Sequence, residues 1–182
     1  MPPLRPKEAS VAGRVKARPP TCLLSAALYL AQALLSSSAG QWEARSQDAY
    51  ILKYRPLADP LAAQYGIPVT LILGIAVLES SSGTSRNARL LNNHFGIVGK
   101  NRLLQTKGIR TRYKQYPDAD SSFVDFCKLL SHRKYYAKLR GSADTDAWVD
   151  AMARAGYSER PDEWRTLAEK YVRSVRRYSE KH

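Results

Sequence analysis

Glu79 is the residue of this sequence best placed to do chemistry, because it is the charge that ends a long apolar run. From Ile67 to Leu78 no residue is charged, and serines and a glycine follow the glutamate directly. A carboxyl near the C-terminal end of a helix faces the negative end of the helix dipole, and apolar surroundings also disfavour its anion. Both effects predict a raised pKa for Glu79. A carboxylic acid that stays protonated near neutral pH can donate its proton to the leaving oxygen of a glycoside.

The position of Glu79 also has a simpler interpretation. The glutamate could merely reach solvent where its helix meets the surface, and position and composition alone favour this reading. Alternatively, the segment from Ser80 to Asn93, which we expect to form loops and short turns, opens the helix end to a substrate groove. The elements around the glutamate therefore have to be placed first.

The run that ends at Glu79 is apolar on every side, which predicts a buried helix at the centre of the fold. Pro68 suits the first position of this helix. The segment before it is predicted to form helical pieces that are interrupted near Pro56 and Pro60 and closed by Gly66.

Downstream of the central helix, the sequence indicates one mixed segment and further helices. Residues 95–116 contain three glycines among mixed polar and apolar residues, which predicts a small β-hairpin. Asp120 or a neighbouring residue is expected to cap a helix through residues 122–132. Another helix should stop at Gly156, and Pro161 should open the last one. The sequence thus predicts a mainly α (α+β) domain with a small β lobe.

The N-terminal 39 residues have the features of an export signal. A start rich in Arg and Lys is followed by an apolar run from Cys22 to Leu35 and by small residues up to Ala39, which suit cleavage. The run is too short to span a membrane comfortably. An uncleaved signal anchor and a disordered basic tail before a core helix are the alternatives. We predict a signal peptide over residues 1–39 and the functional domain over residues 40–182.

The charge balance of the chain is strongly basic, with a formal net charge of +13 at pH 7 over 182 residues. Such an excess predicts a polyanionic partner or surface. A nucleic acid fits poorly, because no known nucleic-acid-binding motif occurs and an export signal leads away from such partners. The three histidines are scattered without ligand-like spacing, and no glycine-rich phosphate loop occurs, so we expect neither metal nor cofactor. Cys127, in helical register with Phe123 and Leu130, is expected to be a buried and inert thiol.

Four motifs occur in the order and spacing of a known enzyme family. They read IPVTLILGIAVLESSSGTS from Ile67, NNHFGI from Asn92, YPDADSSFVDFCKLL from Tyr116 and AMARAGYS from Ala151. Together they resemble the bacterial N-acetylglucosaminidases that cut peptidoglycan, namely the glucosaminidase-domain autolysins and the enzyme domains of flagellar-rod hydrolases. The likeness covers about residues 48–178. It implies a lysozyme-like fold, in which a helical body and a small β lobe border a substrate groove.

The resemblance implies roles for individual residues. Glu79 falls at the catalytic acid of the family, and Tyr157 matches a tyrosine that faces the sugar beside the scissile bond. The turn that shapes the groove and binds substrate falls on Asn92, Asn93, Phe95 and Gly96. Ordinary turn chemistry could equally explain the asparagines and the glycine, and Tyr157 could be a packing aromatic. Structural roles are expected for His94, Ser122 and Phe123.

The sequence departs from the family pattern in two places. Ser81 and Ser82 stand where the family often has Gly-Trp, so an aromatic wall of the groove can be missing. Many members also carry a second acid in the β lobe, but residues 100–115 contain no Asp or Glu. Three accounts stay open: the 2-acetamido group of the substrate is the nucleophile, Asp118 or Asp120 activates water, or the domain only binds wall glycan.

The resemblance therefore implies an exported peptidoglycan hydrolase, periplasmic or secreted, of the endo-β-N-acetylglucosaminidase type. It would cleave the β-1,4 bond after N-acetylglucosamine, with Glu79 as the general acid. The alternative is a catalytically weak or inactive wall-glycan-binding domain of the same fold. We expect a monomer that binds peptidoglycan glycan strands, with no nucleic-acid partner and no stable membrane anchor once the signal is cleaved. The basic residues in 100–115 suit the carboxylates of stem peptides, or equally a solvated surface.

Overall fold

The computed structural model describes the backbone of residues 22–182 and the side chains of residues 41–182. The chain divides into two compact units, Met1–Gly40 and Gln41–His182, and the second contains the predicted functional domain. The predicted signal peptide falls largely outside the described residues, so its cleavage near Ala39 stays a prediction. In the part of the chain that is described, no helix combines the length and the apolar character needed to cross a membrane.

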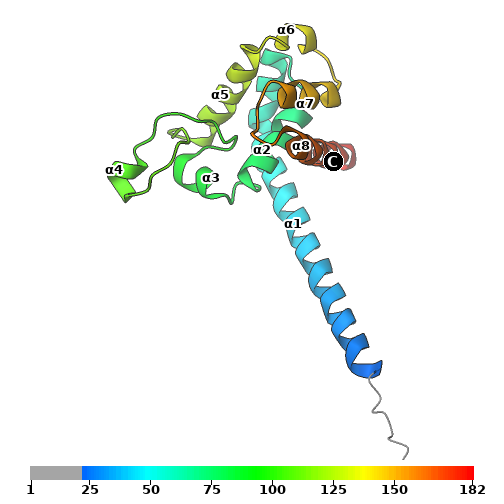
Figure 1. Cartoon of the computed structure of the whole chain (residues 1–182). Coiled ribbons are helices and arrows are strands. Elements are labelled where there is room, and N and C mark those ends of the chain that lie inside the picture. Colours follow the sequence, from blue (N-terminus) through cyan, green and yellow to red (C-terminus); the bar gives the residue numbers. More distant parts are fainter. Residues whose placement is uncertain (1–21) are drawn as a thin grey trace, which may run out of the picture. The chain divides into compact units, whose positions relative to one another are not determined.

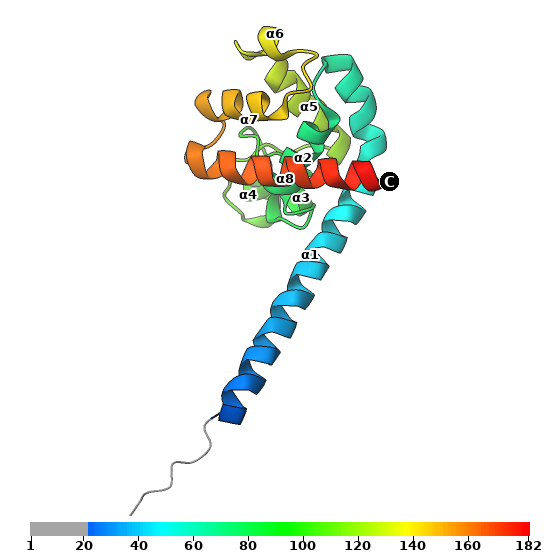
Figure 2. The same ribbon diagram turned by 90° about the vertical axis from the view of Figure 1, so that its right-hand side faces the viewer.

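The unit Gln41–His182 consists mainly of helices, as Figures 1 and 2 show. In chain order the helices are α1 (Cys22–Tyr65), α2 (Val69–Ser80), α3 (Arg86–Leu91), α4 (Leu103–Lys107), α5 (Ala119–Ser131), α6 (Tyr136–Leu139), α7 (Thr145–Arg154) and α8 (Pro161–Lys181). Helix α2 packs against α8 and α7, and α7 also packs against α8. The predicted helical body is confirmed.

Pro56 and Pro60 do not interrupt α1, so that prediction is wrong. Both prolines lie on the exposed side of the helix, in line with the exposed Leu52. A proline lacks the N–H that would bind the carbonyl one turn earlier. Because water reaches this side of the helix, it can satisfy those carbonyls, and α1 continues to Tyr65. Gly66, with a φ of 61°, then ends the helix as predicted.

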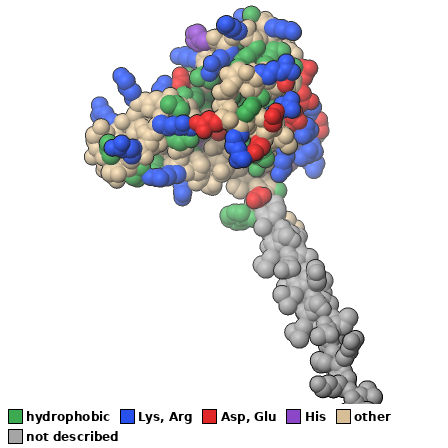
Figure 3. Space-filling model, in the orientation of Figure 1, with side chains coloured by type: hydrophobic (Ala, Val, Ile, Leu, Met, Phe, Trp, Pro, Cys, Tyr) green, Lys and Arg blue, Asp and Glu red, His purple; other side chains and the backbone are tan. Residues whose placement is uncertain are grey.

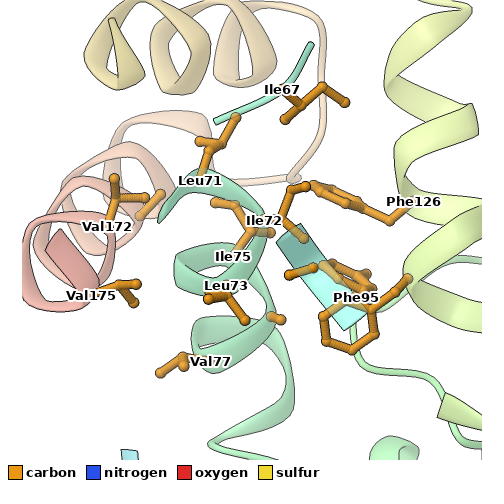
Figure 4. Close-up of a cluster of buried hydrophobic side chains, with 14 of the residues drawn as sticks. Ile67, Leu71, Ile72, Leu73, Ile75, Val77, Phe95, Phe126, Val172 and Val175 are labelled. Carbon is orange, nitrogen blue, oxygen red and sulfur yellow. The ribbon is translucent and has the colours of Figure 1, made fainter. Parts of the chain in front are cut away.

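Helix α2 lies at the centre of the core, as its uniformly apolar sequence predicts. Figure 4 shows Val172 and Val175 of α8 on one side of α2, and Phe95 and Phe126 on the other. Burial on all sides fixes the axis of α2 and therefore the position of the residue at its end.

Helices α2 and α8 approach each other closely at Gly74. A Cβ added to Gly74 would lie 2.8 Å from the backbone Cα of Val172. Only glycine fits between the two backbones at this point. The N-terminal boundary of α2 differs by one residue from the prediction, because Pro68 precedes the helix and its carbonyl accepts the first hydrogen bonds from Leu71 and Ile72.

Other predicted helix boundaries are confirmed. Asp118, a neighbour of the expected Asp120, caps α5 by accepting the backbone N–H of Ser121 at 2.7 Å. Gly156, with a φ of 72°, lies just past the end of α7, and Pro161 begins α8. The expected loop from residue 80 to residue 93 instead contains the short helix α3, which the sequence did not predict.

The predicted β-hairpin is largely wrong. Residues 97–115, called the excursion, hold the short helix α4 and one isolated antiparallel bridge, Val98 to Tyr113, where two strands were expected. The bridge consists of two backbone hydrogen bonds, from Gly99 N–H to the Arg112 carbonyl at 2.9 Å and from Lys114 N–H to the Ile97 carbonyl at 2.8 Å. One further backbone hydrogen bond joins the arms, from Gln115 N–H to the Lys100 carbonyl at 3.0 Å. A lone pair of strands is only marginally stable in water, so these few bonds do not make a β lobe.

Side-chain amides replace the missing sheet ladder. The Asn93 amide nitrogen donates to the carbonyls of Ile97 and Lys114, each at 2.8 Å. The Asn101 amide nitrogen donates to the carbonyls of Thr111 and Tyr113 at 3.0 and 2.9 Å. The two arms of the excursion are therefore held together by asparagine side chains that bridge from one arm to the other.

Candidate active site

A groove of about 650 Å³ lies at the C-terminal end of α2. Its walls come from α2 and α3, both arms of the excursion, the end of α5, and the segment that joins α7 to α8. Charged side chains of both signs line it, namely Glu79, Arg112, Arg133, Glu159 and Arg160. In the view of Figure 3, Lys and Arg side chains are spread widely over the visible face and outnumber the acids there.

Glu79 reaches this groove because α2 ends directly after it. Ser81 and Ser82 take left-handed backbone angles, with φ of 50° and 54°, and the Ser81 N–H closes the helix on the Val77 carbonyl. The Ser80 hydroxyl accepts the N–H of Gly83 at 2.8 Å and fixes the next turn of the chain. The serine-rich segment is therefore a tight helix terminus that stops α2 at the groove.

One oxygen of the Glu79 carboxyl is held from α8. The indole N–H of Trp164 donates to Glu79 Oε1 at 2.7 Å, and Trp164 is itself buried. Burial raises the pKa of Glu79 above the ordinary carboxyl value, while the hydrogen bond from Trp164 acts in the opposite direction. Burial is the larger effect, so the neutral acid is favoured.

The other oxygen of Glu79 faces Gly96. A Cβ added at Gly96 would lie 3.2 Å from Glu79 Oε2, and Gly96 has a φ of 66°. Both the limited space and the left-handed backbone angle favour glycine here. Gly96 lines the groove, so it leaves Oε2 room on the groove side.

Tyr157 also lines the groove, and its hydroxyl is engaged by the backbone. The Tyr157 hydroxyl donates to the Phe95 carbonyl at 3.0 Å, and its ring centroid lies 5.0 Å from that of Trp164. Burial raises the pKa of Tyr157 well above its usual value, and the nearby charge of Glu79 acts in the same direction. The tyrosine therefore stays a neutral phenol and joins the α7–α8 segment to the turn at residues 95–96.

The other residues of the predicted turn hold the backbone next to the groove through buried contacts and hydrogen bonds. Asn93 is fully buried, and Phe95 belongs to the core, stacked on Phe126 with centroids 4.1 Å apart, while also lining the groove. Asn92 ends α3, and its amide donates to the carbonyls of Tyr116 and Pro117. Asn92 and Asn93 do not line the groove, because their amides hold backbone carbonyls.

His94 and Cys127 lie in the core. The His94 ring is 2.7 Å from the Tyr50 hydroxyl and packs near Phe123, and burial lowers its pKa to about 4. Cys127 is buried, as predicted, and burial raises the pKa of its thiol to about 12. Ser122 is buried at the start of α5 and donates to the Ala119 carbonyl.

The two aspartates considered as a second acid lie elsewhere. Asp118 and Asp120 border a separate cavity with Lys114 and Asp125, and neither lines the groove of Glu79. Asp118 is also committed to capping α5. In the described residues, no three His, Cys, Asp or Glu side chains converge as a metal site would require.

Two groove residues, Trp164 and Glu159, were not predicted from the sequence. Trp164 begins a stripe of buried residues along α8 that continues with Ala168, Val172 and Val175, at helical spacing. That spacing predicts a buried tryptophan, whose N–H then needs an acceptor. A buried carboxyl in turn needs a hydrogen-bond donor. These two requirements together could have predicted from the sequence that Trp164 donates to Glu79.

Comparison with known proteins identifies the family. The sequence model of the Glucosaminidase family, described as mannosyl-glycoprotein endo-beta-N-acetylglucosaminidase, matches residues 55–181. The chain is 24% identical over 156 residues to the peptidoglycan hydrolase FlgJ of Vibrio cholerae, a match that covers 76% of this chain and 46% of the relative. With FlgJ of Vibrio parahaemolyticus the identity is 23% over 134 residues, covering 64% and 44%. The chain thus spans less than half the length of these relatives.

Two solved structures share the fold. A chain in a type VI secretion system effector–immunity complex from Pseudomonas protegens has a TM-score of 0.57 and 26% identity, covering 73% of this chain and 93% of that one. The glycoside hydrolase domain of Salmonella typhimurium FlgJ has a TM-score of 0.56 and 24% identity, covering 74% and 91%. The helical fold and the family match over most of the folded unit confirm the resemblance. The chain belongs to the glucosaminidase family, whose members are glycoside hydrolases of the endo-β-N-acetylglucosaminidase type.

Proposed function

We propose that this protein is an exported peptidoglycan hydrolase that cleaves the β-1,4 bond after N-acetylglucosamine, with Glu79 as the general acid. The observation that carries the proposal is the carboxyl of Glu79, which ends a buried helix in a groove and has a raised pKa because of burial. A carboxyl that is still protonated at the pH of the wall can protonate a leaving sugar oxygen.

The contacts of Glu79 indicate which oxygen carries the proton. Oε1 accepts the hydrogen bond from the Trp164 indole, so the acidic proton resides on Oε2. Oε2 lies beside Gly96, where the lack of a side chain lets a glycosidic oxygen approach. Proton transfer from Oε2 to that oxygen breaks its bond to the anomeric carbon as the leaving sugar departs as an alcohol.

Tyr157 supports this arrangement rather than supplying the proton. Its phenol is neutral and donates to the Phe95 carbonyl, which fixes the turn that carries Gly96 opposite Glu79. Its ring lies in the groove and offers a face to a sugar beside the scissile bond.

The arginines of the groove and the predicted export are both consistent with peptidoglycan as the substrate. The groove is lined by Arg112, Arg133 and Arg160, and the whole chain is strongly basic. Carboxylates of the stem peptides are the anions that such a groove would meet on a glycan strand. The FlgJ relatives are named peptidoglycan hydrolases, which supports a periplasmic or secreted location for this chain as well.

Substitution of Glu79 tests the proposal. Glu79→Gln keeps the shape and the hydrogen bond from Trp164 but removes the acidic proton, so release of reducing ends from purified peptidoglycan should fall roughly 10²-fold or more. Folding should survive, because burial already favours the neutral side chain. Glu169→Gln, on the outer part of α8, is the matched control and should keep wild-type activity.

Mass spectrometry of the products decides the bond that is cut. New reducing ends should be N-acetylglucosamine; ends of N-acetylmuramic acid, or its anhydro form, would contradict the proposed specificity. Wild-type activity in a folded Glu79→Gln protein would refute the role of the acid. If the native protein binds peptidoglycan but releases no ends from any preparation, the wall-glycan-binding alternative is correct.

A further inference from the structure

The groove contains two carboxylates among the residues that line it, Glu79 and Glu159. The excursion, where the family resemblance leads one to expect a second acid, contributes Arg112 and Tyr113 to the groove instead. Asp118 and Asp120 border another cavity. Glu159 is therefore the carboxylate that shares the groove with the proposed acid.

Glu159 lies on the segment between α7 and α8, directly after the groove residues Gly156–Ser158. Its Oε1 forms an ion pair with Arg112 Nη2 at 2.9 Å. This contact joins the α7–α8 segment to the far arm of the excursion, so the arginine of one groove wall orients the carboxylate of the other. Arg160, the next residue, is paired with Glu163 at 2.8 Å, so the cation that holds Glu159 is Arg112.

The two groove carboxylates differ in their surroundings. Glu79 is buried and its pKa is raised, whereas the Glu159 side chain is 79% exposed and paired with a cation. Glycosidases need one carboxyl that holds its proton and one that is ionised, and opposite environments produce this division. The charged groups around Glu159 are Arg112 from the excursion, Arg133 from the segment after α5, Arg160 beside it, and Glu79.

We propose that Glu159, oriented by Arg112, is the second catalytic carboxylate and acts as the base that activates the attacking water. This inference rests on the proposed function of the groove. The family resemblance leads one to expect the second acid in the excursion, whereas here the α7–α8 segment on the opposite wall would supply it. Its exposure suits the role, because a base of this kind must hold a water molecule.

The step balances as a single displacement. Glu159 takes a proton from water while the water oxygen forms a bond to the anomeric carbon. The bond from that carbon to the glycosidic oxygen breaks, and the oxygen takes the proton from Glu79 Oε2. One water is consumed, and the two carboxyl groups end with exchanged protonation, which solvent restores.

Replacing Glu159 in the full chain tests this inference with two readouts. Glu159→Gln should lower the rate of reducing-end release from purified peptidoglycan by roughly 10²-fold and alter the pH–rate profile, because glutamine cannot take a proton from the attacking water. Glu169→Gln, on α8 and paired with Arg173 outside the groove, is the matched control and should keep both the rate and the pH–rate profile.

Chemical rescue separates a base from a structural residue. In Glu159→Ala, sodium azide should restore bond cleavage by attacking the anomeric carbon in place of water, and mass spectrometry should find a glycosyl azide at the new chain end. A slow Glu159→Ala protein that azide does not rescue contradicts the role, as does a Glu159→Gln protein with the wild-type rate and profile. These results leave the proposed function intact, whereas an active Glu79→Gln protein would remove it.

Discussion

The two walls of the groove are stabilised in different ways. Helices α2 and α8 meet through apolar side chains, among them Val172 and Val175 of α8 (Figure 4), and their backbones approach closely at Gly74. The excursion has few buried apolar side chains and is held by asparagine amides and a small number of backbone hydrogen bonds. Glu79 stands on the first wall and faces the second. The comparison indicates that α2 and α8 fix the acid, while the excursion shapes the space in front of it and contributes Arg112.

The same substitution at two glycines sharpens this contrast and should give the largest effect. Gly74→Ala places a Cβ within 2.9 Å of backbone atoms of Val172, so α2 and α8 must separate. Overpacking of this kind costs about 3 kcal/mol, and the better helix propensity of Ala returns about 1 kcal/mol, so the net loss of unfolding free energy should be about 2 kcal/mol or more.

Gly99→Ala in the excursion is the matched control. Its Cβ would meet the Cβ of Lys114 at 3.0 Å, so the two arms of the excursion must separate by a few tenths of an ångström, which their few hydrogen bonds allow. The free energy of unfolding, measured by urea denaturation, should change by only about 0.5 kcal/mol. Equal losses in the two variants would show that the walls are packed alike, against the comparison.

Asn93 offers a test on the excursion wall. Asn93→Ala leaves the Lys114 carbonyl and the Ile97 N–H without a partner, while the Ile97 carbonyl keeps its hydrogen bond from the Lys114 N–H. Two unpaired and partly buried polar groups should cost about 2 kcal/mol. Hydrogen exchange should become faster in residues 97–115 while α2 and α8 keep their protection. Loss of protection throughout the unit would show that the excursion is part of the same cooperative core.

The parts predicted from the sequence are those whose signals are local. The uniform apolar run of α2, the proline that begins α8 and the glycine after α7 each act within one turn of helix. The prediction at the prolines of α1 is wrong because a break depends on whether water reaches the helix side that carries them. That exposure is a property of the fold.

The excursion and the groove contacts could not be predicted in the same way. Glycines among mixed polar and apolar residues signal a hairpin, but the bridges made by Asn93 and Asn101 depend on where the second arm returns. The pairs Trp164–Glu79 and Arg112–Glu159 join residues 85 and 47 positions apart. Glu79 stands out in the sequence because an isolated charge in an apolar run is itself a local signal.

Trp164→Phe should have the smallest effect on rate, and its sign tests whether α8 sets the protonation of the acid. Phenylalanine keeps an aromatic ring but loses the N–H that donates to Glu79 Oε1. Since that hydrogen bond lowers the pKa of Glu79 and burial raises it, removal of the donor should raise the pKa further. An acid catalyst works only while protonated, so the alkaline limb of the pH–rate profile should move to higher pH. The rate below that limb should fall only several-fold, because burial still favours the neutral carboxyl. Trp148→Phe is the control, since Trp148 is also buried but donates to the Ser142 carbonyl away from the groove; it should leave the limb unchanged. A limb that moves to lower pH in Trp164→Phe, or that moves alike in both variants, would mean that α8 does not tune the acid.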